Sequence, residues 1–180
     1  MIRTRVGYTG GTTADPTYYS LGDHTESIQV DFDPMVVSYG DLLDVLFGIR
    51  NICAPSPNKQ YMAAVFAMNE TQRQQAEAKL AEWGKRYEEP VRTPVLPAST
   101  FYLAEDYHQK YALKQYGQFT RAFKQYYLDG RALTDSTAAA RVNAFAYGYG
   151  TREQLEQEID GYGLTQEAAG KLRELVQPTS

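Results

Sequence analysis

The alternation of apolar and polar residues predicts strands in the first part of the chain. Residues 2–8 alternate in character and run into two glycines, which indicates a short strand that ends in a glycine turn. Residues 12–23 are rich in Thr, Gly, Asp and Pro and predict a loop. Residues 25–33 alternate regularly and predict a half-buried strand that Pro34 ends. Its apolar face consists of Ile28, Val30 and Phe32.

Helical spacing begins after this strand. Ser38 and Asp41 have the spacing of a capping box and predict the start of a helix. The expected apolar stripe of this helix is Leu42, Leu43, Val45, Leu46 and Ile49. Residues 71–87 form a second amphipathic pattern, with Asn69 or Thr71 as its N-cap.

The rest of the chain changes from mixed to helical character. Residues 61–68 are apolar on both faces and predict a buried central strand, and residues 91–95 predict an edge strand because they contain Pro94. Further helices are expected over residues 104–116, 119–127 and 136–145, followed by two short helices capped by Thr151 and Thr165. Strands interleaved with helices and then a helical tail predict an α+β fold, a two-layer α/β sandwich with a helical C-terminal extension.

Composition limits the possible partners. The 180 residues predict a single domain, with a core over about residues 1–127 and a helical tail over about 128–180. A net charge of −4 argues against nucleic acid or an anionic membrane as a partner. No apolar run approaches the roughly 20 residues of a membrane span, and no signal peptide is expected. Cys53, the single cysteine, excludes an internal disulfide and favours a cytoplasmic protein.

Few residues have an obvious chemical pattern. One cysteine and two histidines cannot form a structural zinc site, so neither a metal nor another cofactor is expected. Glu26 lies at the start of a strand beside a glycine-rich loop, where a carboxyl group could donate a proton, although a surface carboxylate is the simpler interpretation. Tyr107 and Tyr111 share one face of the expected helix, with His108 on an adjacent face, and packing is the simpler interpretation of all three. Cys53 has no neighbouring cation that would activate its thiol.

Six fragments, in order, resemble the peptide methionine sulfoxide reductase A family. They are RVGYTGG at residues 5–11, PTY at 16–18, GDHTESIQVDFDP at 22–34, SYGDLLDVLF at 38–47, QY at 60–61 and FYLAEDYHQKY at 101–111. The short loops and the segment 135–143 resemble a divergent branch of that family. The resemblance implies a ferredoxin-like core and a thiol-dependent reduction of methionine sulfoxide, free or in peptides, with thioredoxin or a small thiol as the reductant.

Carried over position by position, the resemblance also implies site residues. Glu26 would be the general acid, and Tyr18 and Tyr61 would bind the sulfoxide oxygen. The substrate pocket would include His24, Tyr107 and His108.

The nucleophile of the family lies in a GCFWG segment that precedes the glycine-turn strand. This chain starts at Met1, directly before RVGYTGG, so we expect an N-terminal strand, a helix and the nucleophilic cysteine to be missing. Cys53 lies in a different segment and is not expected to replace the nucleophile. Three interpretations stay open: a misplaced start of an active repair enzyme, a non-catalytic protein that binds methionine or its sulfoxide, and a decayed fragment.

Overall fold

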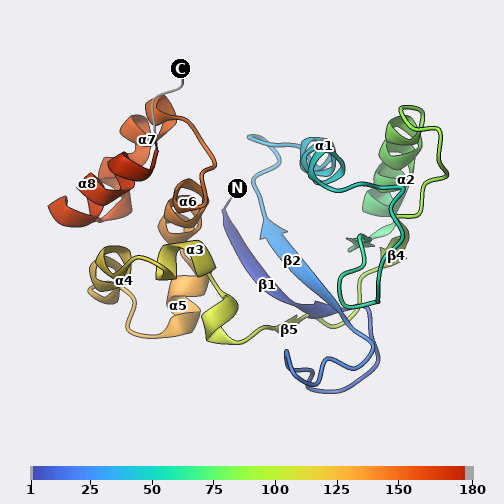
Figure 1. The fold of residues 1–180 in the computed structure, drawn as a ribbon, viewed down its shortest axis with the longest axis horizontal. Coiled ribbons are helices and arrows are strands. Elements are labelled where there is room, and N and C mark those ends of the chain that lie inside the picture. The colour runs from blue at the N-terminus through green and yellow to red at the C-terminus, as the bar shows by residue number, and fades with distance from the viewer. Residues whose placement is uncertain (1, 177–180) are drawn as a thin grey trace. The chain divides into compact units, whose positions relative to one another are not determined.

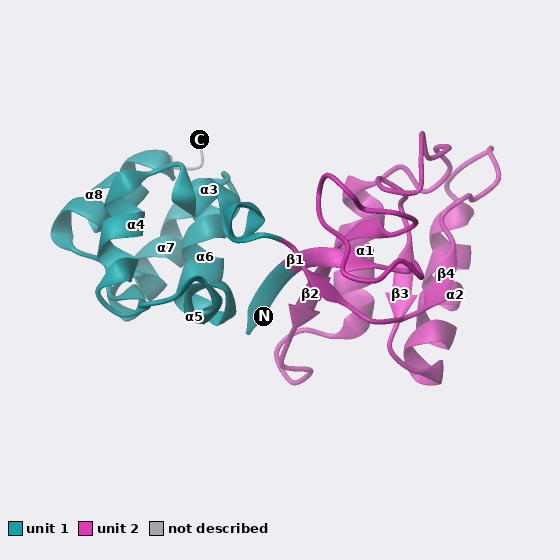
Figure 2. Ribbon diagram, turned by 90° about the horizontal axis from the view of Figure 1, so that it is seen from below, with its two compact units in different colours: residues 1–5, 105–180 teal, residues 6–104 magenta. Residues whose placement is uncertain are grey.

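The computed structural model describes residues 2–176, which form two compact units. One unit comprises residues 6–104 and the other residues 1–5 with 105–180 (Figure 2). The described strands all end before residue 104, and the described elements after it are helices (Figure 1), so the predicted α+β class is confirmed. The prediction of one domain with a core to about residue 127 stays a prediction. Within the described residues, no helix is long and apolar enough to cross a membrane.

A three-stranded sheet contains the glycine-turn strand at its centre. Its order is β2 (Thr25–Asp31), β1 (Arg3–Thr9) and β5 (Tyr102–Leu103), and β5 pairs antiparallel with β1. The first two strands confirm the predictions from alternation. Burial of the second strand is less than predicted, because Ile28 is 61% exposed. Alternation shows which side chains share a face, but it does not supply a layer to cover that face.

A βαβ unit forms the rest of this part of the chain. The helix α2 (Glu70–Gly84) connects two parallel strands, β3 (Val65–Ala67) and β4 (Val95–Pro97), and contacts both. The helix α1 (Tyr39–Ile49) packs on α2. Their shared core consists of Leu43, Phe47, Ile52, Cys53, Val65, Ala76 and Leu80.

Several predicted boundaries in this unit are wrong. The central strand expected over residues 61–68 is only three residues long, because residues 58–61 form a turn held by side-chain contacts. The edge strand lies at Val95–Pro97 rather than at 91–95. The predicted apolar stripe of α1 includes Val45 and Ile49, which are exposed, and omits Phe47, which is buried. Both N-caps are confirmed, with a capping box at Ser38 and Asn69 as the cap of α2.

Helices pack around one core in the other unit. The described helices are η1 (Asp106–His108), α3 (Tyr111–Lys114), α4 (Gly117–Lys124), α5 (Gly130–Asp135), α6 (Thr137–Ala146), α7 (Arg152–Glu158), η2 (Ile159–Tyr162) and α8 (Gln166–Leu175). Their core is built around Phe119, Phe123, Val142, Phe145, Leu155 and Leu172. The predicted N-caps at Thr151 and Thr165 are confirmed.

The helix predicted over residues 104–116 is broken. Lys110 has a left-handed backbone with a φ of 50°, so a short 3₁₀ turn ends before it and a separate helix starts after it. Tyr107 and Tyr111 therefore lie in different elements and do not share a helical face. The helix α5 was not predicted.

Candidate functional site

Glu26 projects from the start of β2 and is exposed. Its backbone N–H donates to the Gln60 carbonyl at 2.9 Å, and its Oε1 accepts a hydrogen bond from Gln60 Nε2 at 2.7 Å. The strand is therefore joined to the 58–61 turn by both backbone and side-chain contacts. The carboxyl group is exposed to solvent, which differs from the partly buried position considered from the sequence.

Two tyrosine hydroxyls continue this hydrogen-bonded chain. Gln60 Nε2 also donates to the Tyr61 hydroxyl at 3.1 Å. A hydrogen bond with Tyr18, then partial burial and the nearby negative charge of Glu26, raise the pKa of Tyr61 above its ordinary value. Glu26, Gln60, Tyr61 and Tyr18 thus form one connected group within a single unit, and it includes all three predicted catalytic residues.

The 58–61 turn is built to hold Tyr61 in place. The Tyr61 N–H donates to Asn58 Oδ1 at 3.1 Å, and Arg50 Nη2 donates to the Tyr61 carbonyl at 3.3 Å. Thr25 Oγ1 donates to the Lys59 carbonyl at 2.9 Å, next to Glu26 in β2. These contacts use the backbone of Tyr61, and its hydroxyl contacts Gln60 and Tyr18 instead.

Tyr18 is positioned by a tight turn on the other side of the group. Thr17 and Ser20 exchange backbone hydrogen bonds of 3.2 and 3.1 Å around it. The Tyr18 ring packs against the small cluster of Tyr8, Leu21 and Ala104. The PTY fragment therefore combines a buried proline, a turn and a partly buried ring that packs against this cluster.

Asp23 and His24 hold the loop that precedes β2. The Asp23 carboxylate accepts hydrogen bonds from the N–H groups of Thr12 and Thr13 at 2.8 and 3.0 Å, and these hold its pKa well below the usual range. His24 is 1% exposed, and its Nδ1 accepts from the Gly11 N–H at 3.2 Å while its Nε2 donates to the Thr13 carbonyl at 2.8 Å. Both ring nitrogens are thus occupied by loop backbone, in the neutral tautomer. His24 fixes the loop beside Glu26, and a pocket role for it stays a prediction.

The loop leaves no room for a side chain at Gly11. A Cβ there would lie 2.6 Å from Asp23 Oδ1 and 2.8 Å from both the Asp23 backbone carbon and His24 Cδ2. The loop backbone must therefore approach the Asp23–His24 pair more closely than any side chain allows.

The other predicted residues lie outside this group. Tyr107 is 52% exposed, and its ring centroid lies 4.2 Å from that of His108. Both residues belong to the helical unit, and their predicted role in a pocket stays a prediction. The Cys53 thiol is buried in the core between α1 and α2 and donates to the Glu89 carbonyl at 3.4 Å, which agrees with its expected lack of reactivity.

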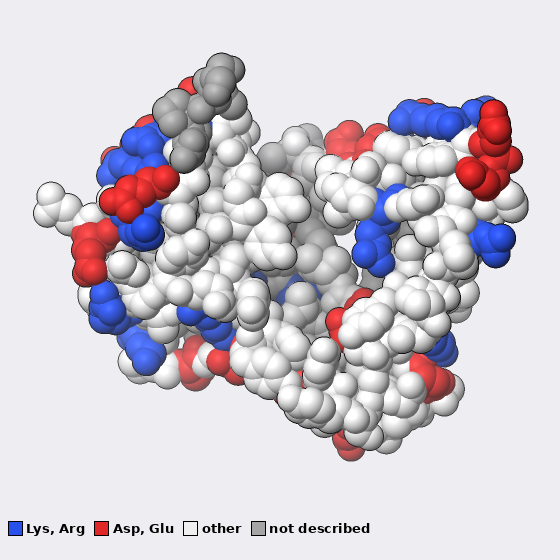
Figure 3. Space-filling view, in the orientation of Figure 1, with Lys and Arg blue, Asp and Glu red and all other residues white. Residues whose placement is uncertain are grey.

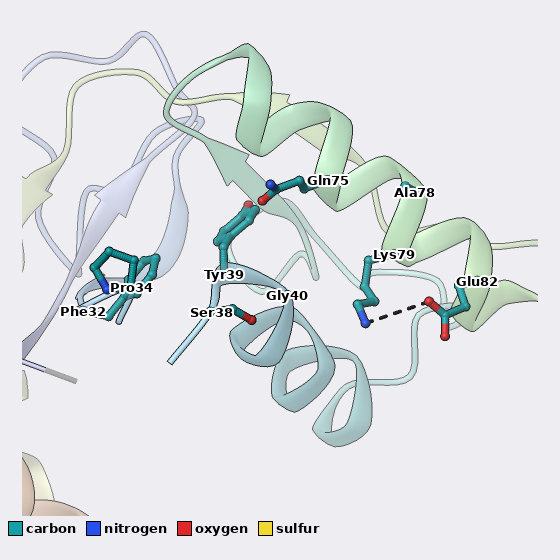
Figure 4. Close-up of a pocket in the computed structure, with 9 residues that line it drawn as sticks. All are labelled: Phe32, Pro34, Ser38, Tyr39, Gly40, Gln75, Ala78, Lys79 and Glu82. Carbon is teal, nitrogen blue, oxygen red and sulfur yellow. Dashed lines mark ion pairs between the residues drawn. The ribbon is translucent and has the colours of Figure 1, made fainter. Parts of the chain in front are cut away.

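Other features of the described residues do not define a competing site. A groove of about 560 Å³ between the start of α1 and α2 is lined by Phe32, Tyr39, Gln75 and Lys79, among others (Figure 4). Lys79 there is paired with Asp44 at 2.9 Å. No cluster of potential metal ligands occurs within residues 2–176. On the face shown in Figure 3, acidic and basic side chains are interspersed, without a large area of one sign.

Comparison with known proteins shows the family to which this chain belongs. The model of the family described as peptide methionine sulfoxide reductase matches residues 1–135, and the chain belongs to that family. A peptide methionine sulfoxide reductase of Drosophila melanogaster is 36% identical over 167 residues, which cover 92% of this chain and 67% of that protein. The MsrA protein of Pasteurella multocida is 42% identical over 117 residues, covering 60% and 67% of the two chains. The crystal structure of reduced Mxr1 from Saccharomyces cerevisiae matches with a TM-score of 0.58 and 25% identity, covering 62% of this chain and 70% of that one.

These matches confirm the resemblance read from the motifs. The sequence match to the Drosophila protein covers more residues than the family model does, so it extends into the segment after residue 135. Sequence reasoning missed one member of the site. Gln60 was recognised only as part of the QY fragment, although the structure places its amide between Glu26 and Tyr61.

Proposed function

We propose that this chain binds methionine S-sulfoxide, free or in peptides, and serves in the thiol-dependent repair of oxidised methionine. The observation that supports this proposal is the hydrogen-bonded group of Glu26, Gln60, Tyr61 and Tyr18. The sulfoxide oxygen carries a partial negative charge and accepts hydrogen bonds. Tyrosine hydroxyls can donate to it, and a carboxylic acid can protonate it as the S–O bond breaks.

Thiols supply the two electrons that reduce the sulfoxide. A cysteine thiolate attacks the sulfoxide sulfur while Glu26 protonates the oxygen. The bond between the two sulfurs and the S–O bond of methionine then break as the hydroxyl group passes to the cysteine sulfur, and the products are methionine and a cysteine sulfenic acid. A second thiol then condenses with the sulfenic acid, releasing water and forming a disulfide, which thioredoxin or a small thiol reduces. We propose that the nucleophile is not Cys53, because that thiol is buried and donates to a backbone carbonyl in the core between α1 and α2.

The cellular setting follows from this chemistry. A thiol cycle runs in a reducing compartment, so we propose a cytoplasmic protein that acts under oxidative stress. The charge balance and the interspersed surface charges do not favour nucleic acid or a membrane surface as a partner.

A binding experiment tests the proposal without requiring turnover. The ¹⁵N-labelled chain is titrated with N-acetylmethionine S-sulfoxide, its R-sulfoxide and the thioether, and the shifted NMR signals are assigned. We expect the S-sulfoxide to bind at Glu26, Tyr61 and Tyr18, and Tyr61→Phe to weaken that binding about tenfold, as the loss of one hydrogen bond does. Equal binding of the sulfoxide and the thioether would refute the proposal.

Turnover gives a second test in any form of the protein that reduces sulfoxide. Glu26→Gln should lower the rate by roughly two to four orders of magnitude, because it removes the general acid. An unchanged rate would exclude Glu26 from the mechanism.

A further inference from the structure

Gln60 contacts both Glu26 and Tyr61 through one side-chain nitrogen. Its Nε2 lies 2.7 Å from Glu26 Oε1 and 3.1 Å from the Tyr61 hydroxyl oxygen. A primary amide has two N–H groups, so it can donate to both partners at once. Its backbone carbonyl also accepts from the Glu26 N–H at 2.9 Å, which keeps Gln60 beside the carboxyl group whatever its side chain does.

The amide nitrogen can only donate, and this fixes where the protons of its partners lie. Because Glu26 Oε1 accepts from Gln60, a proton on the carboxyl group is carried by Oε2. Because the Tyr61 oxygen accepts from the same amide, the hydrogen of the Tyr61 hydroxyl points away from Gln60. One side chain thus sets the direction of two donors.

We propose that Gln60 is a positioning residue that directs the acidic proton of Glu26 and the hydroxyl hydrogen of Tyr61 toward the sulfoxide oxygen. This inference rests on the proposed function, since the sulfoxide is the acceptor that both donors would share. The neutrality of the amide matters as well. A lysine in its place would favour the ionised carboxylate, whereas an amide orients the carboxyl group and leaves it able to gain and release a proton.

The first test needs no ligand. The side-chain amide of Gln60 is observed by ¹⁵N NMR in wild-type protein and in the Glu26→Gln and Tyr61→Phe variants. We expect one N–H signal to move in the first variant and the other to move in the second. The amide of Gln74, which donates to Glu70 Oε1 at 2.8 Å on α2, is the internal reference and should stay in place in both. If neither signal of Gln60 moves, its positioning role is refuted.

The second test measures affinity for N-acetylmethionine S-sulfoxide. Gln60→Leu removes both N–H donors and should weaken binding about tenfold, while the matched control Gln74→Leu should bind as wild type. Gln60→Glu should bind more weakly than wild type, and the deficit should grow to about tenfold from pH 5 to pH 8, as the added carboxyl group loses the proton that it can donate and repels Glu26. A purely structural role would leave that deficit independent of pH.

The outcomes separate the two proposals. Wild-type affinity of Gln60→Leu for the sulfoxide would overturn the positioning role. Wild-type protein that fails to distinguish sulfoxide from thioether would overturn the proposed function, and the amide signals would still decide whether Gln60 orients Glu26 and Tyr61.

Discussion

Lys110 supports a prediction about stability that runs against the usual behaviour of a lysine. The residue is only 5% exposed, and its Nζ donates to the Thr4 carbonyl at 2.5 Å and to Thr4 Oγ1 at 3.2 Å. Burial lowers the pKa of Lys110 from 10.5 to about 8. Asp135 opposes this shift, and the positive charges of Arg5 and Lys114 add to it.

The sign follows from the number of protons bound in each state. Below pH 8 the Lys110 amine is protonated in both the folded and the unfolded chain, and burying the charge destabilises the fold by a constant amount. Between pH 8 and 10.5 the unfolded chain holds more protons, so the free energy of unfolding rises with pH. Lowering the pKa of Lys110 from 10.5 to about 8 changes the free energy of unfolding by about 3 kcal/mol over the whole range, with a slope of up to about 1.4 kcal/mol per pH unit.

Urea unfolding at intervals between pH 7 and 9.5 measures this slope. Stability should rise with pH in wild-type protein, and Lys110→Met should remove most of the rise. The matched control is Lys114→Met, because Lys114 pairs with Asp106 at 3.0 Å and lies one helical turn away, so the rise should remain. The pH range ends at 9.5 so that Tyr162 does not contribute. Burial raises the pKa of Tyr162 to about 12, and the loss of stability that results begins near pH 10. Equal slopes in wild-type protein and Lys110→Met would refute this reasoning.

Three further predictions concern the candidate site and its supports. Tyr18→Phe should lower the pKa of Tyr61 more than Glu26→Gln does, because the hydrogen bond with Tyr18 is the larger cause of the raised pKa. ¹³C NMR of labelled tyrosine measures the pKa of Tyr61 in both variants, and a larger effect of Glu26→Gln would contradict this prediction. Gly11→Ala should destabilise the fold by about 1–3 kcal/mol in urea unfolding, since its Cβ would meet backbone 2.8 Å away, and wild-type stability would show that the loop adjusts freely. Cys53→Ser should leave sulfoxide binding unchanged, and loss of binding would mean that this thiol belongs to the site.

Local signals in the sequence predicted local structure well. The caps at Ser38, Asn69, Thr151 and Thr165 were found because an N-cap depends on residues three positions apart. The break at Lys110 was missed because a lysine does not itself favour a left-handed backbone. The contact of its ammonium group with Thr4 joins residues 106 positions apart, and periodicity carries no information on such a contact.

In the candidate site, too, the sequence predicted local motifs but not the contacts between distant segments. Glu26, Tyr18 and Tyr61 were predicted by resemblance, and the structure brings them together. Gln60 could not be assigned a role from sequence, because its importance lies in two distances that depend on how the 58–61 turn meets β2. Alternation likewise predicted the face of β2 but not its exposure, which depends on what packs above it.

The segment at residues 101–111 separates what a motif says about folding from what it says about chemistry. Tyr102–Leu103 forms β5 against β1, and Ala104 completes the small cluster that supports Tyr18. Gln109 and Lys110 are both buried, so packing explains most of this motif. A match here therefore supports the family fold more strongly than it supports catalysis. The chemical proposal depends instead on the group around Gln60, where side chains from separate segments meet through hydrogen bonds.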